Sequence, residues 1–221
     1  MSRVNKKPHP KASLRILVTS GPTREFIDPI RFISNPSTGA LGYEIANVAL
    51  RRGHKVILIS GPTYLSPPKR AKFIPVVTAL DMKTAAEKYY PFVDCLIMVG
   101  AVSDYRPTKY ISRKIKKIRK RLIIELKRNP DILLELGKRK EDRILVGFSL
   151  ETESLIKNAK QKLKLKNLDL IVSSLFDKSN PPFGSQRIRT IIIDREGKIE
   201  RFFSSKNLLS KKILAKVERM L

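Results

Sequence analysis

Short runs of apolar, mostly β-branched residues recur along the chain and end at turn-forming residues. Leu14–Ser20 and Lys55–Ser60 are two such runs, and each is followed directly by Gly-Pro. This pattern predicts two buried strands. Between them, apolar residues repeat at helical spacing up to Gly53, which predicts a helix that ends there. A strand, a loop, a helix and a second strand in this order are typical of a parallel sheet.

The alternation of apolar strands and amphipathic helices continues to the end of the chain. Further strands are predicted at Phe73–Val77, Cys95–Val99, Leu122–Leu126, Ile144–Phe148 and Leu170–Ser173, and a hairpin at Arg187–Asp194 and Ile199–Phe203. Helices are predicted at Ala79–Tyr90, Ser154–Lys166 and Asn207–Met220, and from Asn129 through Leu136 with Asn129 as the N-cap. We therefore expect a disordered basic arm over residues 1–13. Residues 14–221 should form one α/β domain with a doubly wound, mainly parallel, Rossmann-like sheet and a C-terminal β-hairpin.

Composition narrows the classes of function. The chain has 221 residues, 42% of them hydrophobic, and a formal net charge of +26. Such a charge favours nucleic acid, an anionic surface or a general basic bias. A single cysteine, Cys95, indicates a reducing cytoplasm, and with only His9 and His54 it excludes an ordinary zinc site. No apolar run approaches the roughly 20 residues of a membrane span, so we expect no membrane partner.

In doubly wound sheets, ligands bind beyond the carboxyl ends of the strands. The loops to examine are therefore 21–39, 61–71, 100–120 and 149–153. The first ends in Ser37, Thr38 and Gly39 at a predicted helix start, where free N–H groups and the helix dipole favour a phosphate. Ordinary helix capping by serine or threonine explains the same residues equally well.

Two further segments are strongly basic. Lys109 to Arg121 carries eight basic residues and no acidic one, which is typical of a solvated flap, a nucleic-acid contact or a mobile lid over a polyphosphate. Asp104, just before it, follows a buried strand and is suited to a metal ion or a hydroxyl group. Lys162 and Lys166 are four residues apart, so a helix places them on one face, which is either solvent-exposed or turned toward the mouth of the sheet.

A dinucleotide-binding enzyme is an alternative with little support. Gly39 and Gly42 faintly match the Rossmann fingerprint, but the loop before them is too long for its tight turn. The second strand ends in Ser60-Gly61 without the acidic residue that would bind a ribose hydroxyl. A nucleic-acid-binding module is the other alternative, although the basic run lacks interleaved aromatic residues for base stacking.

Several stretches together resemble one family. These are SGPTREFIDPIRFISNPSTG (20–39), AVSDYRP (101–107), KIKK (114–117), ELKRNPDIL (125–133), VGFSLET (146–152) and KNLDLIV (166–172). In this order they resemble phosphopantothenoylcysteine synthetase, the phosphopantothenate–cysteine ligase of coenzyme A biosynthesis. Many bacterial members are fused to a flavin-dependent decarboxylase. Because few residues precede the first predicted strand here, we expect a stand-alone form with no flavin.

The resemblance implies a two-step reaction. The carboxylate of 4′-phosphopantothenate attacks the α-phosphate of CTP or ATP, pyrophosphate leaves, and the amine of L-cysteine then displaces the nucleoside monophosphate. Mg²⁺ would bridge the triphosphate, with Asp104 as a metal or nucleotide contact, and the enzyme would be a cytoplasmic homodimer that binds no specific nucleic acid. No side-chain nucleophile is needed, since positioning and electrostatics carry such chemistry.

The resemblance also implies roles for individual residues. Asn35 would polarise the acyl carbonyl, and Lys114 would neutralise charge on the α-phosphate. Arg31, from the same chain or from the partner subunit, and Ala101 would join Asn35 in binding the substrate. The remaining nucleotide contacts implied are Ser37, Thr38, Gly39, Gly100, Asp104, Pro130, Asp131, Ile132, Leu133, Phe148, Lys162 and Lys166.

The chain departs from the family's usual pattern at four positions. Thr38 and Ser103 replace a frequent Ser and Ala, Ala40 stands where many members have Lys, and Ile118 follows KIKK where Ser is common. The change at Ala40 removes one charge near the expected phosphates, and the change at Ile118 affects the second half of the basic flap. None of the four removes a residue to which a role is assigned.

Overall fold

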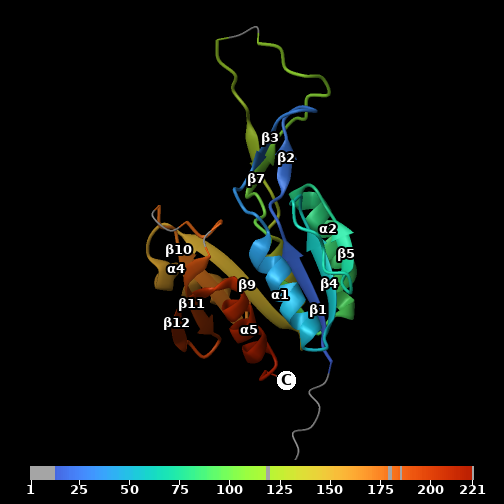
Figure 1. Ribbon diagram of the computed structural model, residues 1–221. Coiled ribbons are helices and arrows are strands. Elements are labelled where there is room, and N and C mark those ends of the chain that lie inside the picture. The colour runs from blue at the N-terminus through green and yellow to red at the C-terminus, as the bar shows by residue number, and fades with distance from the viewer. Residues whose placement is uncertain (1–12, 118–119, 179–180, 185, 221) are drawn as a thin grey trace, which may run out of the picture.

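The computed structural model describes residues 13–117, 120–178, 181–184 and 186–220. An eight-stranded sheet forms the middle of the body (Figure 1), in the order β12-β11-β10-β9-β6-β1-β4-β5. The strands from β10 to β5 are parallel, whereas β11 and β12 add an antiparallel hairpin at one edge. Their bounds are β1 (Arg15–Ser20), β4 (Lys55–Ser60), β5 (Lys72–Pro75), β6 (Cys95–Met98), β9 (Ile144–Glu151), β10 (Leu170–Leu175), β11 (Arg187–Asp194) and β12 (Ile199–Ser205).

Helices cover both faces of the sheet. α1 (Ala40–Arg51) and α5 (Lys206–Val217) pack against each other on one face. The other face carries α2 (Ala79–Tyr89), followed by the short 3-10 helix η1 (Tyr90–Phe92), together with α3 (Ile132–Gly137) and α4 (Leu155–Leu165). This arrangement confirms the predicted doubly wound α/β fold with a C-terminal hairpin.

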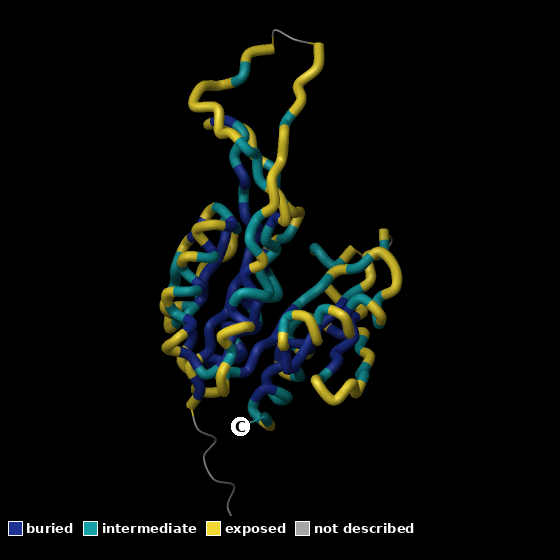
Figure 2. Tube along the Cα trace, turned by 180° about the vertical axis from the view of Figure 1, so that it is seen from behind, coloured by how far each residue is buried: buried dark blue, intermediate teal, exposed yellow. Residues whose placement is uncertain are grey.

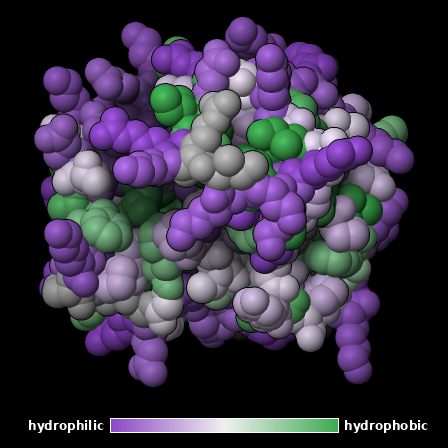
Figure 3. All heavy atoms as spheres, turned by 90° about the horizontal axis from the view of Figure 1, so that it is seen from above, coloured by the Kyte–Doolittle hydropathy of each residue, from purple (hydrophilic) through white to green (hydrophobic). Residues whose placement is uncertain are grey.

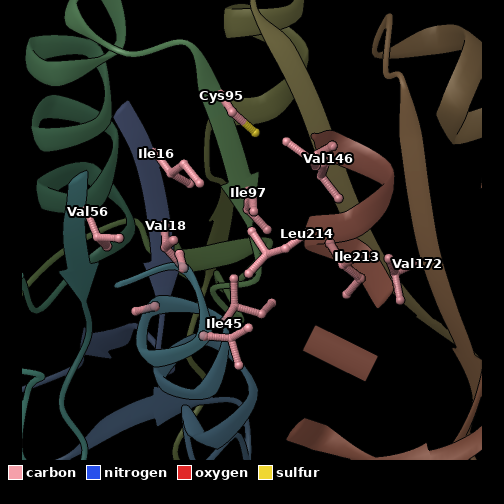
Figure 4. Packing of buried hydrophobic residues seen from close by; sticks show 14 of the residues in the cluster. Ile16, Val18, Ile45, Val56, Cys95, Ile97, Val146, Val172, Ile213 and Leu214 are labelled. Carbon is pink, nitrogen blue, oxygen red and sulfur yellow. The ribbon is translucent and has the colours of Figure 1, made fainter. Parts of the chain in front are cut away.

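The alternation of side chains along each buried strand divides the core into two clusters. Ile16 and Val18 face α1 and α5, where they join Ile45 and Ile213 (Figure 4). Leu17, between them, faces the opposite helices. Cys95 belongs to the cluster of Figure 4, and burial raises the pKa of its thiol. The one cysteine is therefore a core residue and not a nucleophile.

An arm projects from the carboxyl edge of the sheet (Figure 1) and consists of two small hairpins. The bounds of its strands are β2 (Arg24–Phe26), β3 (Phe32–Ser34), β7 (Tyr105–Pro107) and β8 (Leu126–Arg128). The two hairpins contact each other, and the backbone N–H of Ile111 donates to the carbonyl of Ile27 at 3.0 Å. The upper part of the arm is largely exposed, whereas its base is buried (Figure 2).

The structure corrects two predicted elements. Residues 122–125 are not in a strand, and the strand that follows, β8, starts at Leu126. Helix α3 starts after Asp131, whose carboxylate accepts the N–H of Leu134 at 3.0 Å, so Asp131 is the N-cap and Asn129 is not. Asn129 instead donates its amide to the carbonyl of Ser103 at 2.8 Å, which ties the segment before α3 to the arm.

The predicted N-terminal arm and one departure from the family fall largely outside the described residues. Of residues 1–13 only Ser13 is described, and its hydroxyl donates to the carbonyl of Gly53 at 2.7 Å. Ile118 also lies outside the described residues. Both expectations therefore stay predictions.

The turns that follow β1, β4 and β6 lie against one another. The N–H of Gly61 donates to the carbonyl of Ser20 at 3.0 Å, and the N–H of Ala101 donates to that of Gly21 at 2.9 Å. Gly21 has a positive φ of 71°, and a Cβ on it would lie 2.7 Å from the carbonyl oxygen of Gly61. A Cβ on Gly61 would overlap the carbonyl oxygen of Pro22. Only glycines allow this approach, which explains the glycine of each Gly-Pro pair in the sequence.

We expect Gly61→Ala to lower the free energy of unfolding by about 2 kcal/mol or more, because the new methyl group meets backbone atoms that cannot rotate away. Gly184→Ala is the matched control, since a Cβ there meets nothing within 4 Å. Urea denaturation followed by circular dichroism measures both. Equal midpoints for Gly61→Ala and the wild type would contradict the close packing of these turns.

Candidate functional site

Two cavities open at the carboxyl edge of the sheet, where the sequence places the ligand. The α1 cavity, of about 210 Å³, adjoins the start of α1, and the α3 cavity, of about 430 Å³, adjoins the start of α3. Gly100, Ala101 and Phe148 line both of them. One elongated ligand can therefore extend from one cavity into the other. Seen from above, this end of the molecule presents mostly hydrophilic side chains with hydrophobic ones between them (Figure 3).

The α1 cavity is built around the N-terminus of α1. Ser37, Thr38 and Gly39 line it together with the first turn of the helix. Gly39 is the N-cap in a left-handed conformation (φ 77°) and offers no side chain to cap the helix. The hydroxyl of Ser37 accepts the N–H of Gly39 at 3.3 Å, and the hydroxyl of Ser20 donates to the carbonyl of Gly39 at 2.9 Å. The loop is thus held so that the positive end of the helix dipole adjoins the cavity.

The α3 cavity brings together most of the residues that the family resemblance singles out. They come from the loops after β3, β6 and β8, from β9 and α3, and from α4 and its C-cap. Together they line a single cavity. Those that line it are Asn35, Gly100, Ala101, Asp104, Pro130, Asp131, Ile132, Leu133, Phe148, Lys162 and Lys166.

Lys162, on α4, and Lys166, the C-cap of that helix, both line the α3 cavity, so the side that they share is turned toward the mouth of the sheet. Each is paired with a carboxylate: Lys162 Nζ lies 2.6 Å from Glu151 Oε1, and Lys166 Nζ lies 2.8 Å from Asp131 Oδ2. Burial raises the pKa of Glu151, but hydrogen bonds from Lys162 and Asn158 outweigh it and hold that pKa below its ordinary value. These ion pairs fix the directions of two long, flexible side chains before any ligand binds.

Asn35 lies at the junction between the arm and the body. Its side-chain amide donates to the carbonyl of Ala101 at 3.1 Å, so two of the three residues expected to bind substrate are in contact. Asn35 is exposed at the rim of the α3 cavity. An amide donor held in this way, next to a cavity that can admit a ligand, is suited to bind an oxygen that acquires negative charge.

Arg31 and Lys114 lie on the arm and line neither cavity. Arg31 pairs with Asp28 at 2.7 Å and also donates to the carbonyl of Ile115 at 3.3 Å. Burial raises the pKa of the Asp28 carboxyl, yet the N–H groups of Ile30, Ile115 and Arg31 hold it below its ordinary value. Asp28 therefore joins the β2–β3 turn to the basic segment that carries Lys114. Within one chain, the structure does not bring these two basic residues to the cavities.

The cavity walls offer few ligands for a metal ion. Asp104 lines the α3 cavity, as does Asp131, but the part of the chain that the structure describes holds no group of three or more His, Cys, Asp or Glu that could bind a metal. Magnesium commonly uses only one or two carboxylates and completes its shell with water and substrate phosphates. Because Asp131 caps α3 and pairs with Lys166, Asp104 is the carboxylate of this wall that fits an ion arriving with a nucleotide.

Several residues at or beside the cavities were not singled out from the sequence. Glu151 lies within the VGFSLET stretch, but its pairing with Lys162 depends on how β9 and α4 pack. Phe183, which lines both cavities, and Lys206, which lines the α1 cavity, come from the C-terminal third of the chain. No local pattern marks either one, because only the fold brings them to the loops after β1 and β6.

The parallel sheet, with its cavities at the carboxyl edge, defines an α/β protein of the doubly wound, Rossmann-like class. Within that class, the chain belongs to the family described as the DNA/pantothenate metabolism flavoprotein C-terminal domain, whose model matches residues 12–221. None of the helices in the described part of the chain is both long and apolar enough to cross a bilayer.

Relatives in sequence and in structure agree with this membership. The chain is 43% identical over 189 residues to the coenzyme A biosynthesis bifunctional protein CoaBC of Bacillus subtilis (strain 168), a match that covers 85% of this chain and 47% of that protein. It is 37% identical to the CoaBC protein of Borreliella burgdorferi over 97% of this chain and 54% of that protein. The chain thus spans about half the length of these curated relatives.

Solved structures extend the likeness to three dimensions. The crystal structure of the C-terminal domain of a CoaBC protein is 36% identical, with a TM-score of 0.81 over 96% of this chain and 97% of that one. A mutant of Cab2 in complex with phosphopantothenate-cysteine has a TM-score of 0.75 over 94% of this chain and 87% of that one. At 19% identity, the Cab2 structure shows a likeness of fold alone.

Proposed function

We propose that this protein joins 4′-phosphopantothenate and L-cysteine in the cytoplasm, through an acyl-nucleotide intermediate, with consumption of CTP or ATP. The observation that carries this proposal is the α3 cavity, which collects eleven of the residues that the family resemblance singles out. Membership of the family and the CoaBC relatives support the same reaction.

The nucleotide would occupy the α3 cavity and extend toward the start of α1. Lys162 and Lys166 would exchange their carboxylate partners for phosphate oxygens, and the Asp131–Leu133 segment at the start of α3 would hold the rest of the nucleotide. Ser37, Thr38 and Gly39 would bind further phosphate oxygens through hydroxyl and backbone N–H groups. Mg²⁺, bound by Asp104 and the phosphates, would supply charge neutralisation at the polyphosphate.

The two chemical steps need orientation and charge stabilisation from the protein. A carboxylate oxygen of phosphopantothenate would bond to the α-phosphorus, while the bond between the α-phosphorus and the leaving pyrophosphate breaks. Lys114 would offset the negative charge on the α-phosphate. The neutral amine of cysteine would then attack the acyl carbon. Asn35 would donate to the acyl oxygen as it becomes negative. The nitrogen would lose a proton to solvent as the nucleoside monophosphate leaves.

The arm supports a homodimer as the active form. It exposes large apolar side chains, among them Ile30, Phe32, Tyr110 and Ile111, each with at least 40% of its surface accessible. Clustered exposed apolar groups favour burial against another surface. Arg31 and Lys114 line neither cavity of their own chain. In a dimer, the arm of each subunit would bring its Arg31 and Lys114 to the cavities of the other subunit.

Neither alternative function explains these features as well. Ser60, at the end of β4, donates its hydroxyl to the carbonyl of Gly61, so the position that an acidic ribose-binding residue takes in NAD enzymes is occupied by a serine engaged with the backbone. A nucleic-acid-binding module would leave the two cavities at the carboxyl edge without a role.

The proposal predicts a direct assay result. The purified protein, given 4′-phosphopantothenate, cysteine, Mg²⁺ and either CTP or ATP, should release one pyrophosphate for each amide formed. Mass spectrometry identifies phosphopantothenoylcysteine, and reactions that lack cysteine or nucleotide serve as controls. Absence of a cysteine-dependent product with both nucleotides would refute the ligase activity.

Asn35→Asp should separate the two steps. A carboxylate cannot donate to the acyl oxygen and repels its negative charge, so we expect turnover with cysteine to fall by about 10²-fold or more. The first step should persist, and rapid-quench measurement without cysteine should show a stoichiometric release of pyrophosphate. Wild-type steady-state turnover in this variant would contradict the role assigned to Asn35.

Removal of apolar surface from the arm should produce inactive monomers. For Ile30→Ser combined with Tyr110→Ser, we expect sedimentation equilibrium to give the monomer mass and kcat/KM to fall at least about tenfold, because less apolar area is buried between arms. Tyr64→Ser combined with Phe92→Ser is the matched control, since both residues are exposed on the body. A fully active monomer would show that the arm does not serve a second subunit.

A further inference from the structure

Asp28 is a fully buried carboxylate in the turn between β2 and β3, on an arm whose upper part is largely exposed (Figure 2). None of its side-chain surface is accessible, whereas 44% of that of Arg31, its ion-pair partner, is accessible. Charged groups are almost never buried in this way unless they are paired. The two chemical steps of the proposed reaction do not use Asp28. The reason for its burial therefore lies in the groups that it binds.

The two carboxylate oxygens of Asp28 have different partners. Oδ1 accepts the backbone N–H groups of Ile30 and Arg31, both at 2.8 Å, and so closes the turn of its own hairpin. Oδ2 accepts Nη1 of Arg31 at 2.7 Å and the backbone N–H of Ile115 at 3.1 Å. Ile115 lies in the basic segment that carries Lys114, 87 positions further along the chain than Asp28. One oxygen thus serves the hairpin, and the other connects the hairpin to the basic segment.

Ile115 is held through both of its backbone groups. While its N–H binds Asp28, its carbonyl accepts Nη1 and Nη2 of Arg31 at 3.3 and 3.4 Å. Residues 108–117 form neither helix nor strand, and Lys114 is exposed. No ladder of backbone hydrogen bonds therefore fixes the direction in which the chain presents Lys114. The contacts at Ile115 hold the backbone directly beside it.

All the groups that Asp28 binds are hydrogen-bond donors. Burial raises the pKa of its carboxyl, but the N–H groups of Ile30, Ile115 and Arg31 hold that pKa below its ordinary value. Asp28 is therefore ionised at neutral pH, and an ionised carboxylate only accepts hydrogen bonds. It can satisfy all of these donors at once, which an amide of the same shape cannot do.

We propose that Asp28 is a positioning residue of the ligase: through Oδ2 it holds Arg31 and the backbone beside Lys114 in the arrangement in which the arm presents both cations to a site. This inference rests on the proposed function and gives a role to a residue that lines neither cavity. Asp28 itself contacts no substrate and no reacting atom. Its effect on the first chemical step is exerted through Lys114.

Asp28→Asn separates the two oxygens. The amide oxygen can replace Oδ1 and keep the turn closed, whereas the amide NH₂ replaces Oδ2 and meets the donors of Arg31 and Ile115. At saturating substrates, we expect pyrophosphate release in rapid-quench experiments to slow by about tenfold or more, because charge-assisted hydrogen bonds are lost. Glu25→Gln is the matched control, since Glu25 is also a buried carboxylate of the arm but binds the N–H of Ala79 on the body. It should release pyrophosphate at the wild-type rate.

A double-mutant cycle distinguishes positioning from general stabilisation. Lys114→Met removes the ammonium that Asp28 is proposed to place. If Asp28 acts through Lys114, the variant with both substitutions should be no slower in the first step than Lys114→Met alone. A merely structural Asp28 would slow the reaction by the same factor whether or not Lys114 is present, and that result would overturn the inference.

Hydrogen exchange followed by mass spectrometry measures the contact without any turnover. In Asp28→Asn, the amide of Ile115 should exchange about tenfold faster or more, because it loses its acceptor. The amide of Ile111, which donates to the carbonyl of Ile27, should exchange as in the wild type, and so should those of Ile30 and Arg31. Unchanged exchange at Ile115 would contradict the role assigned to Oδ2.

Failure of the inference and failure of the proposed function give different results. If the wild type makes the amide product and Asp28→Asn releases pyrophosphate just as fast, the ligase assignment stands and the positioning role falls. If the wild type makes no amide product, the ligase assignment falls and the positioning role falls with it, even where Asp28→Asn frees the amide of Ile115. The exchange result then reports only a structural contact.

Discussion

The close approach of three strand ends is the constraint on which the rest of the structure depends. The turns after β1, β4 and β6 hydrogen-bond to one another through Ser20, Gly21, Gly61 and Ala101. Side chains at Gly21 or Gly61 would separate these backbones. Both hairpins of the arm leave from these turns, and both cavities border Ala101. The geometry of the site thus follows from backbone packing at one edge of the sheet more than from any single functional side chain.

The body of the fold could be predicted because its signal is local. Buried parallel strands are apolar throughout, so runs such as Leu14–Ser20 stand out from their surroundings. The arm could not be predicted, because its strands are only three residues long and are held by distant partners. Glu25, for example, is buried on β2 and accepts the N–H of Ala79 at 2.9 Å. A charged residue in a polar loop gives no indication of such a partner.

The candidate site likewise has features that the sequence predicts and features that depend on distant partners. The spacing of Lys162 and Lys166 predicts a shared helix face, and the structure confirms that both line one cavity. Their partners Glu151 and Asp131 come from other elements and could not be inferred from spacing. Asn129 and Asp131 show why helix starts are difficult to place, since both are good N-caps. The choice between them depends on the carbonyl of Ser103, which takes the amide of Asn129.

The contact between α1 and α5 has a consequence for how the protein folds during synthesis. β1, α1 and β4 are made well before α5 and can pair with each other, whereas α5 is made after all the other described elements. Until it docks, the apolar face of α1 that includes Ile45 has no helix beside it. Such long-range contacts slow folding, and transiently exposed apolar surface favours aggregation. Nascent chains of this protein therefore carry an uncovered helix face, open to a chaperone, until α5 has been made and has docked.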